Sequence, residues 1–273
     1  MNLEVIVATI EQTDYSLHER MNISSDALIC NQHNTESFHS IDWKGKCVRY
    51  LSTKESGAGI NRNQGLLRAK GDILLFADDD MVYHDSYEKL VLEAFHQLPN
   101  ADMIFFNVDS SGDPIKRESI ERITRVRKHN AFRYGTVRLA IRRRSQVRHG
   151  VWFPMDFGPG SKYPSGEDSL FISTCIKHGL VIYAVPIEIG VIQTRASTWF
   201  DGFTKGYFIS KGALFAALFK RCYLLYAIYY VVRHPAHRGE RSVFEVLNFI
   251  RTGAKEYLKG EAHENESDLF LLR

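Results

Sequence analysis

The chain has 273 residues, of which 44% are hydrophobic and 12% aromatic, and its formal net charge is only +3. This length and composition exclude a disordered chain and suit one large α/β domain, or one domain with a helical appendage.

The cationic residues gather in the middle of the chain. Between Lys116 and Arg148, twelve lysines and arginines accompany two acidic residues, Glu118 and Glu121. We expect this basic section to seek phosphate or an anionic surface. No nucleic-acid recognition motif accompanies the charge, so no nucleic-acid partner is predicted.

The cysteines and the N-terminus predict a cytoplasmic protein. The four cysteines are widely spaced and form no CxxC pair, which is typical of reduced core residues: Cys30, Cys47, Cys175 and Cys222. The first residues lack a basic region ahead of the first apolar run, so no signal peptide is predicted.

The first hundred residues alternate between strand-like and helix-like segments. Strands are predicted at residues 3–10, 26–31, 48–51, 72–76 and 102–107, and helices at 61–70 and 86–97. Gly57 and Gly59 predict a flexible turn before the first of these helices. The first three strands are expected to be parallel. A helix at 168–178 and a strand at 181–185 follow, and from Lys211 onward the chain is expected to be helical.

The stretch LLFADDDMVY, residues 74–83, places three consecutive carboxylates directly after a buried strand. Adjacent like charges repel, so a positive partner is expected, and Mg²⁺ and Mn²⁺ favour oxygen ligands. The strand's alternation is expected to aim Asp78 and Asp80 to the same side and Asp79 elsewhere. A solvated acidic turn is the alternative. Ligands bind at the carboxyl edge of open α/β sheets, and that location favours the metal.

The segment GINRNQGLLRAKGDILLFADDDMVY, followed about ninety residues later by SGEDSLF, resembles the family 2 glycosyltransferases with a GT-A fold. The resemblance covers Leu3 to about Lys211. It implies an α/β fold with a mixed, mostly parallel sheet flanked by helices. It also implies a glycosyltransferase domain at 1–210, with a nucleotide-sugar-binding half (1–110) and an acceptor and catalytic half (111–210). Residues 211–273 then form a C-terminal helical extension.

The resemblance also implies roles for individual residues. Asp78 and Asp80 would hold Mn²⁺ or Mg²⁺, and Asp168 would be the general base. The sugar nucleotide would contact Thr9, Asn31, Arg62, Asp78 and Asp79, and the acceptor would contact Gly166, Glu167 and Trp199. The alternatives are a charge pair at a helix N-terminus for Glu167 and Asp168, an exposed helix arginine for Arg62, and a core tryptophan for Trp199.

The resemblance predicts an inverting enzyme that moves one sugar from a nucleotide-diphosphate sugar, a UDP-sugar by preference. The expected acceptor is a saccharide or lipid-linked oligosaccharide in capsule or exopolysaccharide assembly. One alternative is a metal-dependent nucleotidyl- or phosphotransferase, although the chain has no P-loop. Another is a non-catalytic subunit that binds a sugar nucleotide.

The apolar run CYLLYAIYYVV, residues 222–232, is too short to cross a bilayer. Lys220, Arg221, Arg233 and Arg238 flank it, which favours a helix lying on the inner face of the cell membrane. A buried helix packed on the core is the alternative.

Overall fold

The computed structural model describes residues 1–110, 118–193 and 202–271, with side chains described as far as Gly260. The described chain forms two compact units. Unit 1 comprises Met1–Asp156 and Glu167–Ala196, and unit 2 comprises Phe157–Gly166 and Ser197–Arg273. The predicted domain boundary after residue 210 stays a prediction. In the structure, the first helix of the C-terminal part begins at Lys205.

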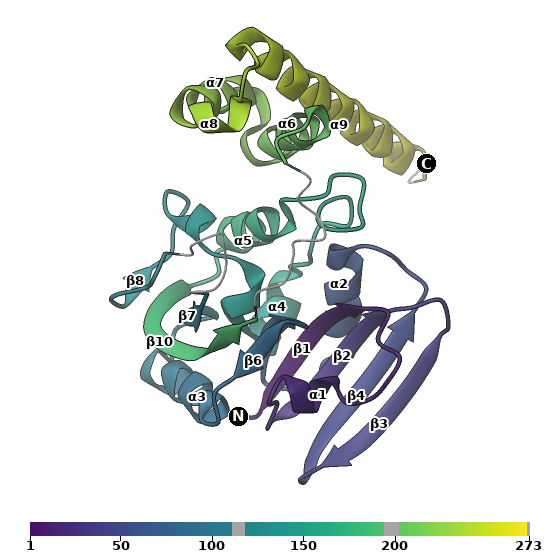
Figure 1. Cartoon of the computed structure of the whole chain (residues 1–273), viewed down its shortest axis with the longest axis vertical. Helices are drawn as coiled ribbons and strands as arrows, with labels where there is room; N and C mark the ends of the chain where they lie inside the picture. Colours follow the sequence, from purple (N-terminus) through teal and green to yellow (C-terminus); the bar gives the residue numbers. More distant parts are fainter. Residues whose placement is uncertain (111–117, 194–201, 272–273) are drawn as a thin grey trace. The chain divides into compact units, whose positions relative to one another are not determined.

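Unit 1 is built on one mixed sheet (Figure 1). Its strands are β1 Leu3–Ile10, β2 Asp26–Gln32, β3 Ser37–Trp43, β4 Lys46–Thr53, β5 Ile73–Asp78, β6 Met81–Tyr83, β7 Met103–Asp109, β8 Thr124–Arg125, β9 Leu139–Arg142 and β10 Ile182–Ile192. Its helices are α1 Leu17–Arg20, α2 Ala58–Arg68, α3 Tyr87–Gln97, η1 Ala131–Arg133, η2 Thr136–Arg138, α4 Arg143–His149 and α5 Glu167–Lys177.

The strand order is β3-β4-β2-β1-β5-β9-β7-β10-β6, and β8 pairs with β10. Parallel pairing joins β4, β2, β1 and β5, as predicted for the first three strand segments, and it joins β7 to β10. The other pairs are antiparallel. The parallel strands β1 and β5 therefore end side by side, with Ala8 opposite Asp78.

Both faces of the central strands of this sheet are buried, whereas no residue of the edge strand β3 is fully buried. Along β1, Val5 and Val7 belong to one hydrophobic cluster and Ile6 to the other, as the two-residue period of a strand requires. Helix α3 packs on the first face, and α2 and α5 pack on the second. This two-sided burial explains why the strand sequences are apolar runs rather than alternating patterns.

Helix α2 begins earlier than predicted. Gly57 caps it with φ of 123°, and Gly59 lies inside its first turn, so the expected flexible turn at both glycines was wrong for Gly59. Gly65 faces β1, where an added Cβ would meet the side chain of Ile6. The close approach of α2 to the sheet therefore requires a glycine there.

Two predictions about side-chain environment need correction. Cys30 and Cys175 are buried as expected, but Cys47 and Cys222 are exposed. The basic section is not one exposed cationic surface, because Arg138 and Arg142 are buried. Arg142 donates hydrogen bonds to the carbonyl oxygens of Ala101 and Phe95, at 2.7 and 3.0 Å. These arginines satisfy buried backbone acceptors and leave less charge for a ligand.

From Gly202 onward the described part of unit 2 is helical (Figure 1), whereas Phe157–Gly166 is a loop. Its elements are α6 Lys205–Phe219, η3 Lys220–Cys222, α7 Tyr223–Arg233, α8 Pro235–Arg238 and α9 Val243–Leu271. A third hydrophobic cluster joins α6, α7 and α9 around Phe208, Phe215 and Ile250.

Helices α6 and α9 cross at two glycines, and this contact gives a prediction. A Cβ on Gly253 would overlap the carbonyl oxygen of Ile209, and one on Gly212 would overlap that of Ile250. Helix propensity alone favours Gly253→Ala by about 1 kcal/mol. We expect the substitution instead to destabilise the protein by about 1–3 kcal/mol, because two backbones must move apart.

Gly260 in the same helix is the matched control, since an added Cβ there meets nothing within 4 Å. Gly260→Ala is therefore expected to leave stability unchanged or to raise it. Thermal unfolding of both variants measures the difference. Equal effects at the two positions would contradict the close crossing.

Candidate active site

The three aspartates lie at the carboxyl edge of the sheet, as predicted. Strand β5 ends at Asp78, however, and Asp79 and Asp80 form a turn before β6. The argument that strand alternation aims Asp78 and Asp80 to one side was therefore wrong. Gln193, which follows β10, also lies at this edge, because its backbone amide donates to the Asp80 carbonyl oxygen at 2.8 Å.

Arg62 joins the two acidic motifs. Its side chain lies on α2 and is buried. Nη2 lies 2.9 Å from Oδ1 of Asp78, and Nη1 lies 3.1 Å from Oε1 of Glu167 and 3.7 Å from Oδ1 of Asp168. The guanidinium therefore holds the strand-end acid and the acids at the start of α5 in one cluster.

A second set of donors fixes Asp168. The backbone N–H of Thr136 donates to Oδ2 at 3.1 Å, and the Thr136 hydroxyl donates to Oδ1. A Cβ on the neighbouring Gly135 would lie 3.2 Å from Oδ2. Thr136 begins η2 and is buried. The sequence argument missed this residue, because a lone threonine in a basic section carries no motif.

Burial and charge shift the proton affinities in this cluster. Burial raises the pKa of Glu167 to about 7; the charge of Asp168 adds to this shift and Arg62 opposes it. For Arg62, burial acts to lower the pKa, but the three surrounding carboxylates outweigh it and raise the pKa. One arginine thus faces three acids, and Glu167 is the acid whose proton affinity rises into the neutral range.

This shift predicts a pH dependence of stability. Between about pH 4.5, the ordinary pKa of the glutamate, and about pH 7, the folded chain holds the Glu167 proton and the unfolded chain releases it. This group's contribution to the free energy of unfolding therefore falls as pH rises through that window. Glu167→Gln keeps an acceptor for Arg62 and removes the titration. We expect the variant to gain on the order of 2 kcal/mol relative to the parent between pH 4.5 and 8.

Urea denaturation of parent and variant across this range measures the effect. Glu93→Gln serves as the control, because Glu93 is exposed on α3. A stability difference for Glu167→Gln that stays constant with pH would contradict the shift.

Thr9 and Asn31, predicted to contact the nucleotide, are both buried and bonded within the protein. The Thr9 hydroxyl donates to Oδ2 of Asp79 at 2.6 Å, which ties the ends of β1 and β5 together. The Asn31 side chain accepts from the Gln12 amide at 3.0 Å and donates to the Gln12 carbonyl at 2.9 Å. Their direct contact with a nucleotide stays a prediction, as does that of Arg62.

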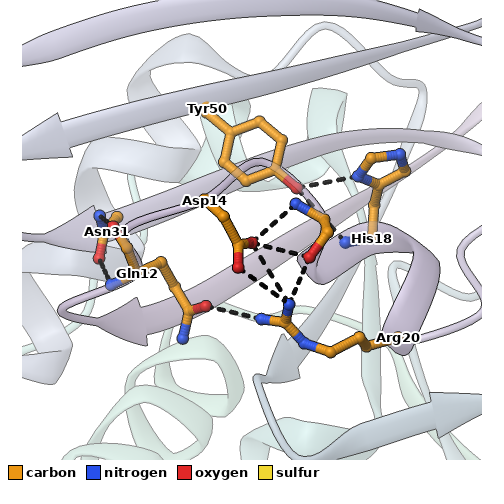
Figure 2. A network of polar contacts seen from close by, with 7 residues as sticks. Gln12, Asp14, His18, Arg20, Asn31 and Tyr50 are labelled. Atoms are coloured by element: carbon orange, nitrogen blue, oxygen red, sulfur yellow. Dashed lines mark hydrogen bonds and ion pairs between the residues drawn. The ribbon is translucent and has the colours of Figure 1, made fainter.

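Figure 2 shows how Asn31 holds the loop after β1. The Gln12 side chain accepts from Nη2 of Arg20 at 2.8 Å, and Arg20 also pairs with Asp14 at 3.3 Å. Nearby, the ring of His18 lies 2.9 Å from the Tyr50 hydroxyl. This network orders the loop at the carboxyl ends of β1 and β2, and the sequence argument named only Asn31 from it.

Of the other two predicted acceptor residues, the structure describes only Gly166. Gly166 has φ of 111°, and a Cβ there would meet the Leu214 side chain at 2.7 Å, so its small size serves packing on α6 within unit 2. Trp199 lies outside the described residues.

The carboxylates at the end of β5 are oxygen donors of the kind that a divalent cation prefers. The Asp78 side chain is 41% exposed, and Asp80 lies two residues further along the turn. In the ranges that the structure describes, no group of three or more His, Cys, Asp or Glu side chains is arranged to hold a metal. A cation here would need phosphate oxygens and water as further ligands, which is how Mg²⁺ is often bound.

One cavity among the described residues lies away from this cluster. It has a volume of about 680 Å³ and is lined by Arg125, Arg127 and Lys128 of the basic section, with Leu180 and Tyr183. Gly179 and Leu180 follow the C-terminus of α5, whereas the acid cluster lies at its N-terminus. We base the candidate site on the acid cluster because it gathers the titratable groups.

Comparisons with known proteins agree with this geometry. Residues 29–156 match the sequence profile described as glycosyl transferase family 2. A structure of Staphylococcus aureus TarS, residues 1–349, in complex with UDP-GlcNAc is similar in fold. It has a TM-score of 0.60 and 14% sequence identity, and the match covers 95% of this chain and 92% of that one.

The same TarS segment in complex with UDP has a TM-score of 0.56 and 15% identity, with coverage of 86% and 72%. No curated protein sequence matched the chain. The mixed sheet with flanking helices is GT-A-like, and the profile match spans the strand-end aspartates and Arg62. The chain therefore has a GT-A-like fold, and its residues 29–156 are similar to the family 2 glycosyltransferases.

Proposed function

We propose that this chain is an inverting, metal-dependent glycosyltransferase that moves one sugar from a UDP-sugar to a saccharide acceptor. The observation that carries the proposal is the Arg62 cluster, in which the donor-side acid Asp78 and the base candidate Asp168 share one guanidinium. The UDP-GlcNAc in the similar TarS structure supports a UDP-sugar donor.

In this proposal Asp168 acts as the base. Its carboxylate is oriented by Thr136 and faces Arg62, and its side chain is 32% exposed, so an acceptor hydroxyl can reach it. As that hydroxyl oxygen attacks the anomeric carbon, its proton passes to Asp168. The bond from the anomeric carbon to the diphosphate oxygen breaks, and its electron pair stays on the diphosphate. Attack from the face opposite the leaving group inverts the anomeric configuration.

The leaving diphosphate gains negative charge, which the site must balance. Mn²⁺ or Mg²⁺ held by Asp78 and Asp80 would supply positive charge there as a Lewis acid. Asp79, tied to Thr9, fixes the turn that presents these carboxylates. Arg62 limits the mutual repulsion of the acids in the absence of donor.

The proposal also includes the class of acceptor and the place in the cell where transfer occurs. We place transfer at the cytoplasmic face of the membrane, onto a lipid-linked oligosaccharide during capsule or exopolysaccharide assembly. The resemblance of the acid motifs to family 2 glycosyltransferases supports this setting, and no contact among the described residues defines the acceptor.

A donor screen tests the function. The purified chain is mixed with a panel of nucleotide sugars, with and without Mn²⁺, and thermal stabilisation and release of UDP are measured. We expect a UDP-sugar to raise the unfolding temperature in the presence of Mn²⁺, because a ligand that binds only the folded state stabilises it. Asp80→Asn should remove the part of this stabilisation that depends on Mn²⁺.

The products separate the alternatives. Release of intact UDP with a glycosylated acceptor supports transfer, whereas pyrophosphate or a phosphorylated product would indicate a nucleotidyl- or phosphotransferase. Donor binding without turnover across many acceptors would indicate a non-catalytic subunit.

A further inference from the structure

The outer face of α7 is apolar and exposed. Leu225, Ile228, Tyr229 and Val232 are 71%, 43%, 58% and 66% exposed, and their spacing places them on one side of the helix. Ala227 and Val231, on the other side, are buried in the core of unit 2. Helix α7 thus has apolar residues both on the side packed in unit 2 and on the side exposed to solvent.

A surface helix of a globular protein normally presents polar residues to water. A contiguous exposed apolar stripe instead marks a surface that meets another apolar phase or a partner. Packing of α7 against α6 and α9 fixes which side faces inward, so the outward stripe is a property of the folded unit (Figure 1).

The charge around the stripe has one sign. From Gly202 to Gly239 the sequence contains six lysines and arginines and no aspartate or glutamate. Lys220 and Arg221 precede α7 and Arg233 ends it, and all three are exposed. A partner that complements this surface is apolar beneath a negatively charged layer, which describes a bilayer with anionic lipids better than a second acidic protein.

The structure favours lying on a bilayer over crossing it. Within the described residues, the stretch Lys205–Arg233 is long and apolar enough to be a candidate membrane span, with a mean hydropathy of 1.3. In the fold this stretch is broken at Lys220, which has φ of 48°, into α6 and α7. Helix α6 has 15 residues and is about 22 Å long, shorter than the hydrocarbon core of about 30 Å.

We propose that the outer face of α7 docks on an anionic membrane surface. Leu225, Ile228 and Val232 enter the boundary of the acyl chains, the Tyr229 ring lies at the headgroup level, and the cations at both helix ends contact lipid phosphates. This surface belongs to unit 2 and is independent of the sugar-transfer chemistry proposed for unit 1.

Vesicle sedimentation tests the surface with the full chain. Two vesicle types are used, phosphatidylcholine alone and phosphatidylcholine with about one third phosphatidylglycerol. We expect binding to the anionic vesicles that weakens as salt is raised. The double variant Leu225→Glu/Val232→Glu should bind about tenfold or more weakly, because two apolar contacts become charges that anionic lipid repels.

Val147→Glu is the matched control, since Val147 on α4 is 63% exposed, nearly as much as Val232, and lies in unit 1. It should bind vesicles like the parent. The triple variant Lys220→Gln/Arg221→Gln/Arg233→Gln should lose the preference for anionic lipid. Thermal stabilisation by the UDP-sugar is measured for each variant. Stabilisation equal to that of the parent would show that unit 1 is intact, and stabilisation of the parent itself tests the proposed function separately.

Four results would overturn the proposal. The first is equal vesicle binding by the parent and the Leu225→Glu/Val232→Glu variant, and the second is no binding by the parent. If light scattering shows a parent dimer that this variant dissociates, a second copy of the chain covers the stripe. Protein that alkaline carbonate cannot release from vesicles would indicate a spanning segment and would equally exclude surface docking.

Discussion

Asp168→Asn is expected to lower the rate of sugar transfer by about 10³-fold or more while donor affinity changes by less than about threefold. A general base alone contributes about 10²–10⁴-fold to such reactions. The loss of rate should reach the upper part of that range, because the side-chain amide of the variant cannot take up the proton of the acceptor hydroxyl. Donor binding should persist, because Arg62 still holds Asp78 at 2.9 Å. Single-turnover transfer and calorimetry with the UDP-sugar measure the two quantities.

Asp102→Asn is the matched control for this substitution. Asp102 is also half-buried, and it also accepts from one hydroxyl and one backbone amide, those of Ser145 at 2.6 Å and Val181 at 2.7 Å. Loss of these bonds lowers stability, as it does for Asp168, but Asp102 has no role in the proposed transfer. We therefore expect Asp102→Asn to retain transfer per folded molecule. Full transfer by Asp168→Asn would exclude Asp168 as the base.

The acid motifs could be predicted from sequence because each directly borders a strongly patterned element. The apolar run of β5 leads into Asp78, and Glu167 and Asp168 begin α5. That the two motifs meet follows from the fold, since Arg62 pairs with Glu167, which lies 105 positions further along the chain. The sequence placed Arg62 on a helix, but it could not show that the guanidinium is buried among carboxylates.

Other parts of the fold and of the site could not be predicted from a sequence pattern. Strand β9 is four residues long and lies within the basic section. From the sequence alone, its Arg142 is expected to be an exposed cation. Only the structure shows that this arginine satisfies the carbonyls of Ala101 and Phe95. Thr136 orients Asp168 through its backbone amide as well as its hydroxyl, and a backbone donor has no sequence signature.

The turn after β5 shows a limit of strand periodicity. Alternation applies only while the chain stays extended, and three adjacent acids give no indication of where a strand ends. The strand ends at Asp78, the last residue of β5 that pairs with β1, and Arg62 holds the Asp78 side chain. Periodicity therefore predicted the location of the acid edge and not the directions of its side chains.

Arg62→Met is expected to destabilise the protein by about 3–5 kcal/mol at pH 8, because removing one partner of a buried ionic cluster leaves the others unpaired. Here the unpaired groups are Asp78, Glu167 and Asp168. The loss should shrink as pH falls, since protonation of these carboxylates removes their repulsion. Arg62→Lys should be intermediate at best, because an ammonium lacks the planar fork that bridges several acids.

Arg49→Met distinguishes a role in the site from a role in stability alone. Arg49 is buried to the same extent as Arg62 and pairs with the buried Glu4 on β1, away from the acid cluster. Both substitutions should lower the unfolding temperature. Only Arg62→Met should also abolish transfer by the protein that remains folded, because Asp168 loses the charge that holds it beside the donor acid. If the two variants lose transfer only in proportion to the unfolded fraction, Arg62 stabilises the fold and does not organise the site.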